Sequence, residues 1–191
     1  FINIVNQIPA DFENNSVQRI KPHKGNPDDT NGDETVNYLQ KVRKVAWRIN
    51  SVHPSSLGLH PIIYFYSSDG RHKTSSFYAV TARIIESENE NTLKDFINVR
   101  PTFEDLLLKY DYLIQDINRK YRQAINSYTH IKDFFTECIK ILSKGKGVDE
   151  AIAEIIKSRE FGYLKVDTAK EDITSAEFST ERKSAIFIKE A

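Results

Sequence analysis

The apolar residues of the chain recur mainly at intervals of three and four, the spacing of a helix with one buried face. The longest such stripe covers residues 102–127 and predicts one helix of about six turns. Pro101 precedes this stripe, and Thr102-Phe103-Glu104-Asp105 is a variant capping box with Asp in place of Glu or Gln. An apolar stripe of this length predicts that partner helices cover it.

The same spacing predicts shorter helices along the rest of the chain. They cover residues 1–8, 35–52, 74–87, 129–144, 148–159 and 180–191. Pro9 ends the first of these helices, and Thr35 is placed to cap the second. A Thr or Ser within residues 74–76 is placed to cap the third, and Gly145 supplies a left-handed stop after the fourth. The pattern therefore indicates roughly six helices.

Residues 51–73 interrupt the helical pattern, because Gly58 and a proline exclude a continuous helix. Residues 62–66 are β-branched and aromatic, which favours a strand. A buried helical turn that begins at Pro61 fits these residues equally well, since periodicity does not decide short apolar runs. With residues 161–166 as a second candidate strand, we expect a mainly α fold: an irregular multi-helix bundle with at most a small two-stranded β element.

The composition of the chain changes along its length and indicates four parts. Two Pro, two Gly and four acidic residues make residues 21–34 an acidic polar linker. The four parts are a truncated helical segment over 1–20, the linker over 21–34, a helical domain over 35–178, and a helix over 179–191 that leads to a C-terminal module. The chain begins at Phe1 without Met, and its last helical pattern still runs at Ala191, so we expect a fragment of a longer protein.

Composition excludes several classes of protein. No window approaches the ~20 apolar residues of a membrane span, so we expect no membrane partner. One cysteine, Cys138, excludes an internal disulfide framework and a multi-cysteine zinc site, and it favours a reducing, cytoplasmic location. Cys138 belongs to an apolar stripe, which predicts a buried hydrophobic side chain rather than a reactive thiolate.

The net charge is zero, but the charges are unevenly distributed. Residues 35–73 hold six basic residues and one acidic residue, interleaved with Trp47 and other aromatic side chains. The basic residues are Lys41, Arg43, Lys44, Arg48, Arg71 and Lys73. Cations among aromatic rings bind phosphates and stack bases, so this patch predicts a DNA contact that the acidic linker can mask. A solvated helix face followed by an aromatic core segment explains the same pattern.

The segment 53–72 also holds several side chains that can carry chemistry. They are His53, His60, Tyr64, Tyr66, Asp69 and His72. A metal-dependent enzyme would gather the three histidines and the aspartate, but their spacing matches no helix face. Two of the histidines precede a proline and can simply shape turns. We therefore predict no catalytic residue, metal or cofactor in this chain.

Residues 53–72, HPSSLGLHPIIYFYSSDGRH, followed by Phe77 in a helix, resemble a segment of bacterial multidomain HNH-endonuclease proteins. These are similar to the type IV GmrSD-like restriction group, which has a ParB-like domain, a helical region and an HNH nuclease. Residues 178–191, FSTERKSAIFIKEA, resemble the helix that leads into the HNH module. The ParB-like Asp-Gly-Gln-Arg motif is absent, its closest string being residues 69–72, and no HNH zinc knuckle occurs.

The resemblance implies that this chain is the helical middle region of such a protein, without either active site. The sequence thus predicts a non-catalytic helical domain of a bacterial DNA-processing or defence protein. It would position flanking domains of the same polypeptide and contact DNA through the basic patch. One alternative is a protein–protein interaction module, and the partner could then be another copy of the chain in an oligomer. A second alternative is a metal-dependent enzyme that uses the histidine segment.

Overall fold

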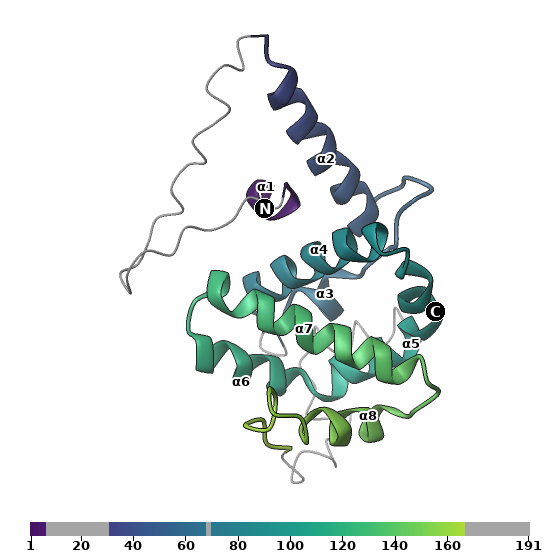
Figure 1. The fold of residues 1–191 in the computed structure, drawn as a ribbon, viewed down its shortest axis with the longest axis vertical. Coiled ribbons are helices and arrows are strands. Elements are labelled where there is room, and N and C mark those ends of the chain that lie inside the picture. Colours follow the sequence, from purple (N-terminus) through teal and green to yellow (C-terminus); the bar gives the residue numbers. More distant parts are fainter. Residues whose placement is uncertain (7–30, 68–69, 167–191) are drawn as a thin grey trace. The chain divides into compact units, whose positions relative to one another are not determined.

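The computed structural model describes residues 1–6, 31–67 and 70–166 of the chain (Figure 1). Within these residues the protein is mainly helical and has no β-strand, which confirms the predicted fold class. The chain divides into two compact units, residues 1–58 and residues 59–191. The boundary falls after Gly58, inside the range 35–178 that the sequence analysis treats as one domain.

Several sequence predictions concern residues that the structure does not describe, namely 7–30, 68–69 and 167–191. They are the end of the first helix at Pro9, most of the acidic linker, the position of Asp69 and the helix over 179–191.

Unit 1 contains two helices that contact each other, α1 (Ile2–Val5) and α2 (Asp33–Ile49). The prediction that Thr35 caps the second helix is wrong, because α2 already begins at Asp33. Gly32 adopts a left-handed conformation with φ 80°, and its carbonyl accepts the first helical hydrogen bond, from the amide of Val36. The side chain of Asn31 accepts a hydrogen bond from the amide of Asp33 at 3.3 Å, so this turn starts the helix.

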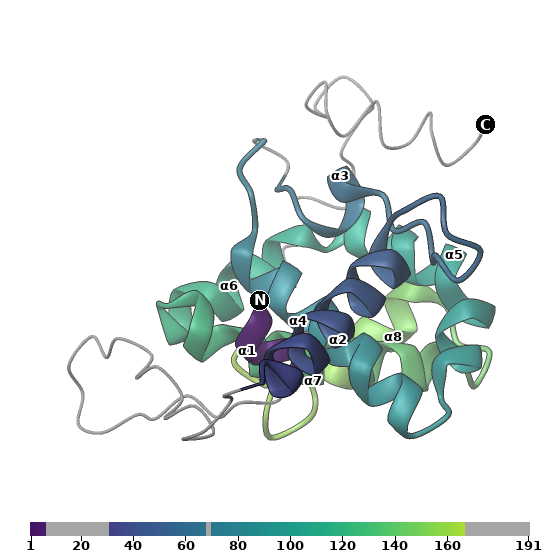
Figure 2. The same cartoon turned by 90° about the horizontal axis from the view of Figure 1, so that it is seen from above.

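Unit 2 is built around its longest helix, α7. Its helices are α3 (Pro61–Tyr64), α4 (Thr74–Asn89), α5 (Leu93–Lys109), α6 (Asp111–Tyr121), α7 (Ala124–Leu142) and α8 (Val148–Ile155). Helix α7 contacts α4, α5, α6 and α8, while α3 contacts α4 and α5. Figures 1 and 2 show α5 and α6 toward opposite ends of α7. The core of unit 2 therefore lies around the apolar side of α7.

The apolar stripe predicted for residues 129–144 is confirmed. Its members are all buried: Ile131, Phe134, Phe135, Cys138, Ile139 and Leu142. Each large apolar side chain buried in this way contributes about 1.5–3 kcal/mol. Burial also raises the pKa of the Cys138 thiol well above its ordinary value, which agrees with the predicted hydrophobic role. The predicted left-handed stop is also present, since Gly145 has φ 81°.

The prediction of one helix over residues 102–127 is wrong. Helix α5 begins at Leu93 and contains Pro101, and the chain leaves the helical conformation at Tyr110 before α6 begins. Pro101 lies on the exposed side of α5, where the carbonyl that loses its helical donor can face water. Thr102 is consequently inside a helix and does not cap one.

Two tertiary contacts lie at the break between α5 and α6. The Tyr110 hydroxyl donates a hydrogen bond to Asp149 of α8 at 2.9 Å, and Asp111, the first residue of α6, is buried beside Lys73.

Of the two interpretations of residues 62–66, the helical turn is confirmed and the strand is wrong. Pro61 occupies the first turn of α3, where its missing amide hydrogen is not needed. Antiparallel pairing near this segment is limited, among the described residues, to one isolated bridge between Tyr66 and His72. Residues 161–166 are turn and irregular structure, with Phe161 and Leu164 buried, so the two-stranded element with residues 62–66 does not form.

The remaining predicted boundaries differ by a few residues. Helix α4 has no side-chain cap, so the predicted Thr or Ser cap is wrong, and Lys73 takes the N-cap position. Helix α7 begins at Ala124 rather than at residue 129, and α8 ends at Ile155 rather than at residue 159. These are the positions where periodicity is least informative.

Candidate functional site

Helix α2 carries the first four cations of the predicted basic patch. Lys41, Arg43 and Lys44 are exposed, Arg48 is half-buried, and Val45 and Ile49 are buried. The steps from Lys41 to Lys44 and from Lys44 to Arg48 are three and four residues, so these three cations follow one face, whereas Arg43 lies four residues before Trp47 on another face. Within residues 41–48 there is no acidic side chain to offset them.

A stacked aromatic group lies beside these cations at the end of α2. The rings of Trp47 and His53 are parallel to within 5°, with their centroids 4.6 Å apart. The guanidinium carbon of Arg43 lies 4.9 Å from the centre of the Trp47 ring. Trp47 and His53 are both exposed, so a further planar group can stack on the outer face of the imidazole.

Hydrogen bonds from the following turn hold His53 in this position. Ser51 accepts a hydrogen bond from the His53 amide at 3.1 Å and donates one to the Trp47 carbonyl at 2.9 Å. The Ser55 amide donates to Nδ1 of His53 at 3.1 Å, which fixes the plane of the ring. Arg48 donates through Nη1 to the Ser55 carbonyl at 2.8 Å. Arg48 therefore secures the turn that carries His53.

The other two cations of the predicted patch belong to unit 2 and differ from each other. Lys73 is buried, and its Nζ donates to Oδ1 of Asp111 at 2.6 Å, with the two side chains 6% and 5% exposed. A buried cation cannot contact a phosphate of DNA, so Lys73 is excluded from the predicted basic patch. Arg71 is exposed, and its backbone pairs with Ser67.

The histidine segment does not converge on a metal in the described residues. His60 accepts a hydrogen bond from the Ile62 amide through Nδ1 at 3.3 Å and so caps α3. His72 lies edge-on to Tyr66, with Nδ1 3.3 Å from the Thr74 hydroxyl. No group of three potential metal ligands occurs in the part of the chain that the structure covers. His53 and His60 thus shape a turn and a helix end, as their positions before proline indicate.

Tyr64 joins a buried polar group that sequence reasoning missed. Its hydroxyl donates to Oε1 of Glu104 at 2.8 Å, and Nε of Arg100 donates to the same oxygen at 2.7 Å. Burial, and then the charge of Glu104, raise the pKa of Tyr64 well above its ordinary value, so the phenol stays protonated. The spacing of four between Arg100 and Glu104 is the one signal that the sequence offered.

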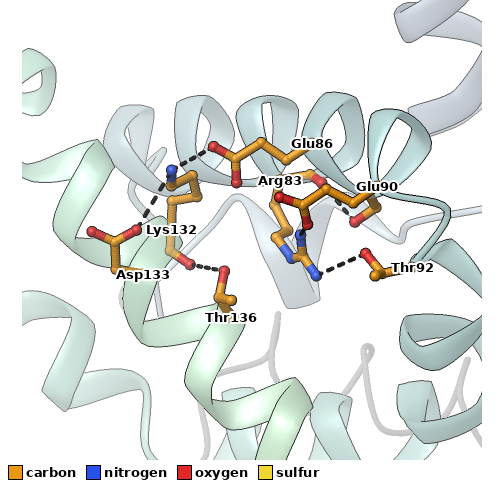
Figure 3. A network of polar contacts seen from close by, with 8 residues as sticks. Arg83, Glu86, Glu90, Thr92, Lys132, Asp133 and Thr136 are labelled. Carbon is orange, nitrogen blue, oxygen red and sulfur yellow. Dashed lines mark hydrogen bonds and ion pairs between the residues drawn. The ribbon is translucent and has the colours of Figure 1, made fainter.

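Helices α4 and α7 are joined by a second polar group (Figure 3). Lys132 of α7 donates to Glu86 of α4 and also lies 3.5 Å from Asp133. Burial lowers the pKa of Lys132, but its hydrogen bond and ion pair with Glu86 outweigh this effect and raise the pKa overall. This pair is a structural contact between two helices.

Arg83 lies in the same part of α4, but its guanidinium is turned away from Lys132 toward Thr92 and Glu90 (Figure 3). It borders a largely apolar hollow in unit 2, together with side chains from α3, α4, α5 and α7. The Nε atom of Arg83 is buried and has no hydrogen-bond partner among the described residues. Sequence reasoning did not single out Arg83, because its burial depends on how α4 and α5 pack.

Comparison with family models, with curated proteins and with solved structures finds no match to this chain. None of the helices in the described residues combines the length and the apolar character needed to cross a membrane.

Proposed function

We propose that the chain is a non-catalytic helical module of a DNA-processing protein and that α2 contacts nucleic acid. The observation that carries this proposal is the parallel stack of Trp47 and His53, with Arg43 against Trp47. Lys44 and Lys41 are exposed on the same helix, three and six positions before Trp47. Cations that neutralise phosphates, next to rings on which a base can stack, are the two parts of a sequence-tolerant nucleic-acid surface.

The position of the cations along α2 supports a role beyond helix stability. Cations stabilise a helix through its macrodipole only in the last turn, where each contributes about 0.3–1 kcal/mol. In α2 only Arg48 lies in that turn, whereas Lys41, Arg43 and Lys44 precede it. The helix dipole thus explains one of the four cations.

The resemblance of residues 53–72 to HNH-endonuclease proteins supports the same proposal. In such a protein this module would position flanking domains of the polypeptide while α2 holds the nucleic acid. The catalytic chemistry would then belong to the flanking domains, and no residue of this chain is assigned to it.

Salt-dependent binding tests the proposal. With three to four phosphate contacts, the logarithm of the association constant should fall with the logarithm of salt concentration with a slope of about −3. Replacing Lys41, Arg43 and Lys44 by Glu should weaken binding by at least about tenfold and flatten the slope. A matched control replaces three exposed cations of unit 2, Lys94, Lys144 and Arg159, by Glu. Equal losses in both triple variants would reject a specific role of α2.

The contribution of stacking is tested separately. His53→Ala removes the imidazole that we expect to stack on a base, and this should reduce affinity for a single-stranded oligonucleotide more than for a duplex. Base stacking contributes about 1–3 kcal/mol, so the loss should be several-fold or more. An identical loss for both nucleic acids would argue that His53 acts only through the fold of its turn.

A second candidate function is docking of α2 on a partner protein. Val36 and Leu39 are 50% and 51% exposed, and both lie on the exposed side of the helix that Trp47 shares. Apolar side chains gathered on one exposed face favour a protein interface. If Val36→Ser with Leu39→Ser dissociates an oligomer in sedimentation and leaves oligonucleotide affinity unchanged, α2 has an interface of this kind.

A further inference from the structure

A continuous row of aromatic side chains runs through unit 2 from the segment after α3, over the start of α4, to α7. Its five members are Tyr66, His72, Phe77, Tyr78 and Tyr128. We propose that this row binds single-stranded nucleic acid, with unpaired bases stacked on its rings. The proposal rests on the nucleic-acid function proposed above, but the row uses none of the residues of α2.

Each ring of the row contacts the next one. The ring centroids of Tyr66 and His72 are 5.5 Å apart, and those of His72 and Phe77 are 6.1 Å apart. The steps from Phe77 to Tyr78 and from Tyr78 to Tyr128 are both 6.2 Å. The first two members of the row are exposed and the other three are half-buried, so a ligand can reach the row along its length.

Backbone geometry and core packing hold the row in place. Two backbone hydrogen bonds flank Tyr66 and His72, which form an antiparallel pair with their side chains on the same face. Phe77 packs edge-on against the buried Phe65, with the ring centroids 5.3 Å apart, and this contact anchors the row to the core. The next residue of α4 contacts Tyr128 of α7, so the packing of the two helices extends the row.

The charge around the row suits a polyanion. Residues 70–85 and residues 117–132, the two stretches that hold the row after its first ring, contain three and four Lys or Arg and no Asp or Glu. The acidic residues that directly follow these stretches, Glu86 and Asp133, both pair with Lys132. A surface of one sign attracts the phosphates of a nucleic acid, so the charges favour this ligand over a neutral one.

Two exposed cations lie toward opposite ends of the row. Arg71 directly precedes His72, within the paired segment that starts the row. Arg122 lies two residues before α7, whose fifth residue is Tyr128, so the two are separated by little more than one helical turn. Cations in these positions can contact the phosphates of a strand whose bases stack on the rings.

The spacing of the rings favours an unpaired strand. Bases in a duplex stack about 3.4 Å apart, and their faces are covered by their neighbours. The rings of the row are 5.5 to 6.2 Å apart, so bases must separate from one another to stack on them. A proline-rich peptide is the competing occupant, since such peptides also dock on aromatic surfaces. It would not use the surrounding cations, which is why we favour the nucleic acid.

Photocrosslinking of the unaltered full chain locates the bound strand. The probe is an oligothymidylate in which some thymidines are replaced by 5-bromodeoxyuridine, and mass spectrometry identifies the crosslinked residues. We expect crosslinks at one or more of the five rings of the row. Crosslinks confined to α2, or no crosslink in the row, would overturn the proposal. Binding of a polyproline peptide at the row without any crosslink of the oligonucleotide there would also overturn it.

Two matched double variants test stacking. Tyr66→Leu with Tyr78→Leu keeps apolar volume but removes two rings, and it should weaken oligothymidylate binding by at least about tenfold. Tyr66→Phe with Tyr78→Phe keeps both rings, and its affinity should stay within about twofold of the original. Fluorescence anisotropy measures the affinities, and the thermal unfolding midpoint shows that each variant is folded. Equal affinities of the two double variants would mean that the rings do not hold the bases.

The cations are tested by the salt dependence of binding. Arg71→Gln with Arg122→Gln should flatten the slope by about 1.4, because each phosphate contact with a single strand contributes about 0.7. Lys94→Gln with Arg159→Gln is the control, since both are exposed cations of unit 2 outside the row. An equal change of slope in the control would reject the assignment of Arg71 and Arg122.

The same assay separates this proposal from the one for α2. If the Glu variant of Lys41, Arg43 and Lys44 binds oligothymidylate as well as the original protein, while the Leu variant of the row does not, the row is supported and the α2 surface is rejected. The reverse result would reject the row and leave the α2 surface.

Discussion

Tyr64 and Glu104 are forty positions apart in the sequence, yet the Tyr64 hydroxyl donates to a carboxylate oxygen of Glu104 at 2.8 Å inside unit 2. The contact joins the short helix α3 to the middle of α5. Arg100 donates to the same oxygen, so the buried carboxylate keeps a cationic partner. These three residues hold α3, which follows the irregular segment around Gly58, in a fixed position against α5.

Removal of the hydroxyl should loosen this connection. We expect Tyr64→Phe to lower the free energy of unfolding by about 1–2 kcal/mol, because the hydrogen bond from the hydroxyl to the Glu104 carboxylate is lost. The loss stays moderate because Arg100 still donates a hydrogen bond to Glu104. Urea unfolding measures the change. Tyr66→Phe, at an exposed tyrosine nearby in the sequence, should change stability by less than about 0.5 kcal/mol. Equal effects of the two substitutions would mean that the buried hydroxyl contributes nothing specific.

Lys73 and Asp111 form a more deeply buried ion pair, which Gln115 extends by donating to the second oxygen of Asp111 at 3.1 Å. Removing one partner leaves a buried charge, so Lys73→Met alone should destabilise unit 2 by about 3–5 kcal/mol. Lys73→Met combined with Asp111→Leu should recover much of that loss, because no charge is then left buried. A double-mutant cycle in urea measures the coupling, and additive single effects would contradict it.

The helices that the sequence predicts best are those whose own residues determine them. The stripe from Ile131 to Leu142 has an uninterrupted three-four spacing, and all its predicted members are buried. Cys138 is correctly predicted for the same reason. Gly145 is also correctly predicted, since a glycine after such a stripe is a strong local signal for a helix end.

The failures share a physical cause, which is that tertiary contacts override local signals. Pro101 looks like a helix start, but it is tolerated on the exposed side of α5. At the break between α5 and α6, Tyr110 donates a hydrogen bond to Asp149 of α8, and Lys73 is buried against Asp111, and both contacts join residues far apart in the sequence. The cations of α2 in the candidate site could be predicted from the sequence. The stack of His53 on Trp47 and the burial of Arg83 could not, because they depend on side-chain packing.

Asp149 gives the protein a pH-dependent contact between α8 and the junction of α5 with α6. Hydrogen bonds from Lys109 and then from Tyr110 lower the pKa of Asp149 below its ordinary value of 3.8. The stabilisation is complete above the unfolded pKa and is lost as pH falls through the lower folded pKa. Because Asp149 is 67% exposed, the contribution should be small, about 0.2–1 kcal/mol.

Asp149→Asn tests this contact. The variant should be slightly less stable than the original protein at pH 7, and the difference should shrink as pH falls below about 4. Glu137→Gln is the control, since Glu137 pairs on the surface with Lys140 of the same helix. Chemical unfolding at a series of pH values measures both variants. A difference for Asp149→Asn that stays constant from pH 7 to pH 3 would contradict the assigned titration.

The turn after α7 contains Gly145 and Gly147. Substitutions at these two positions allow the effect of backbone strain to be measured apart from that of side-chain packing. A Cβ atom added at either glycine would meet nothing within 4 Å, so neither substitution creates a clash. Gly145 has φ 81°, a conformation that costs an L residue about 1–2 kcal/mol, whereas Gly147 has φ −72°.

Gly145→Ala should therefore lower the free energy of unfolding by about 1 kcal/mol. Gly147→Ala should be nearly neutral, because a weaker N-cap and a less flexible unfolded chain offset each other. Urea unfolding of the two variants compares them directly. If Gly147→Ala proved the more destabilising, the left-handed conformation at Gly145 would not be what ends α7.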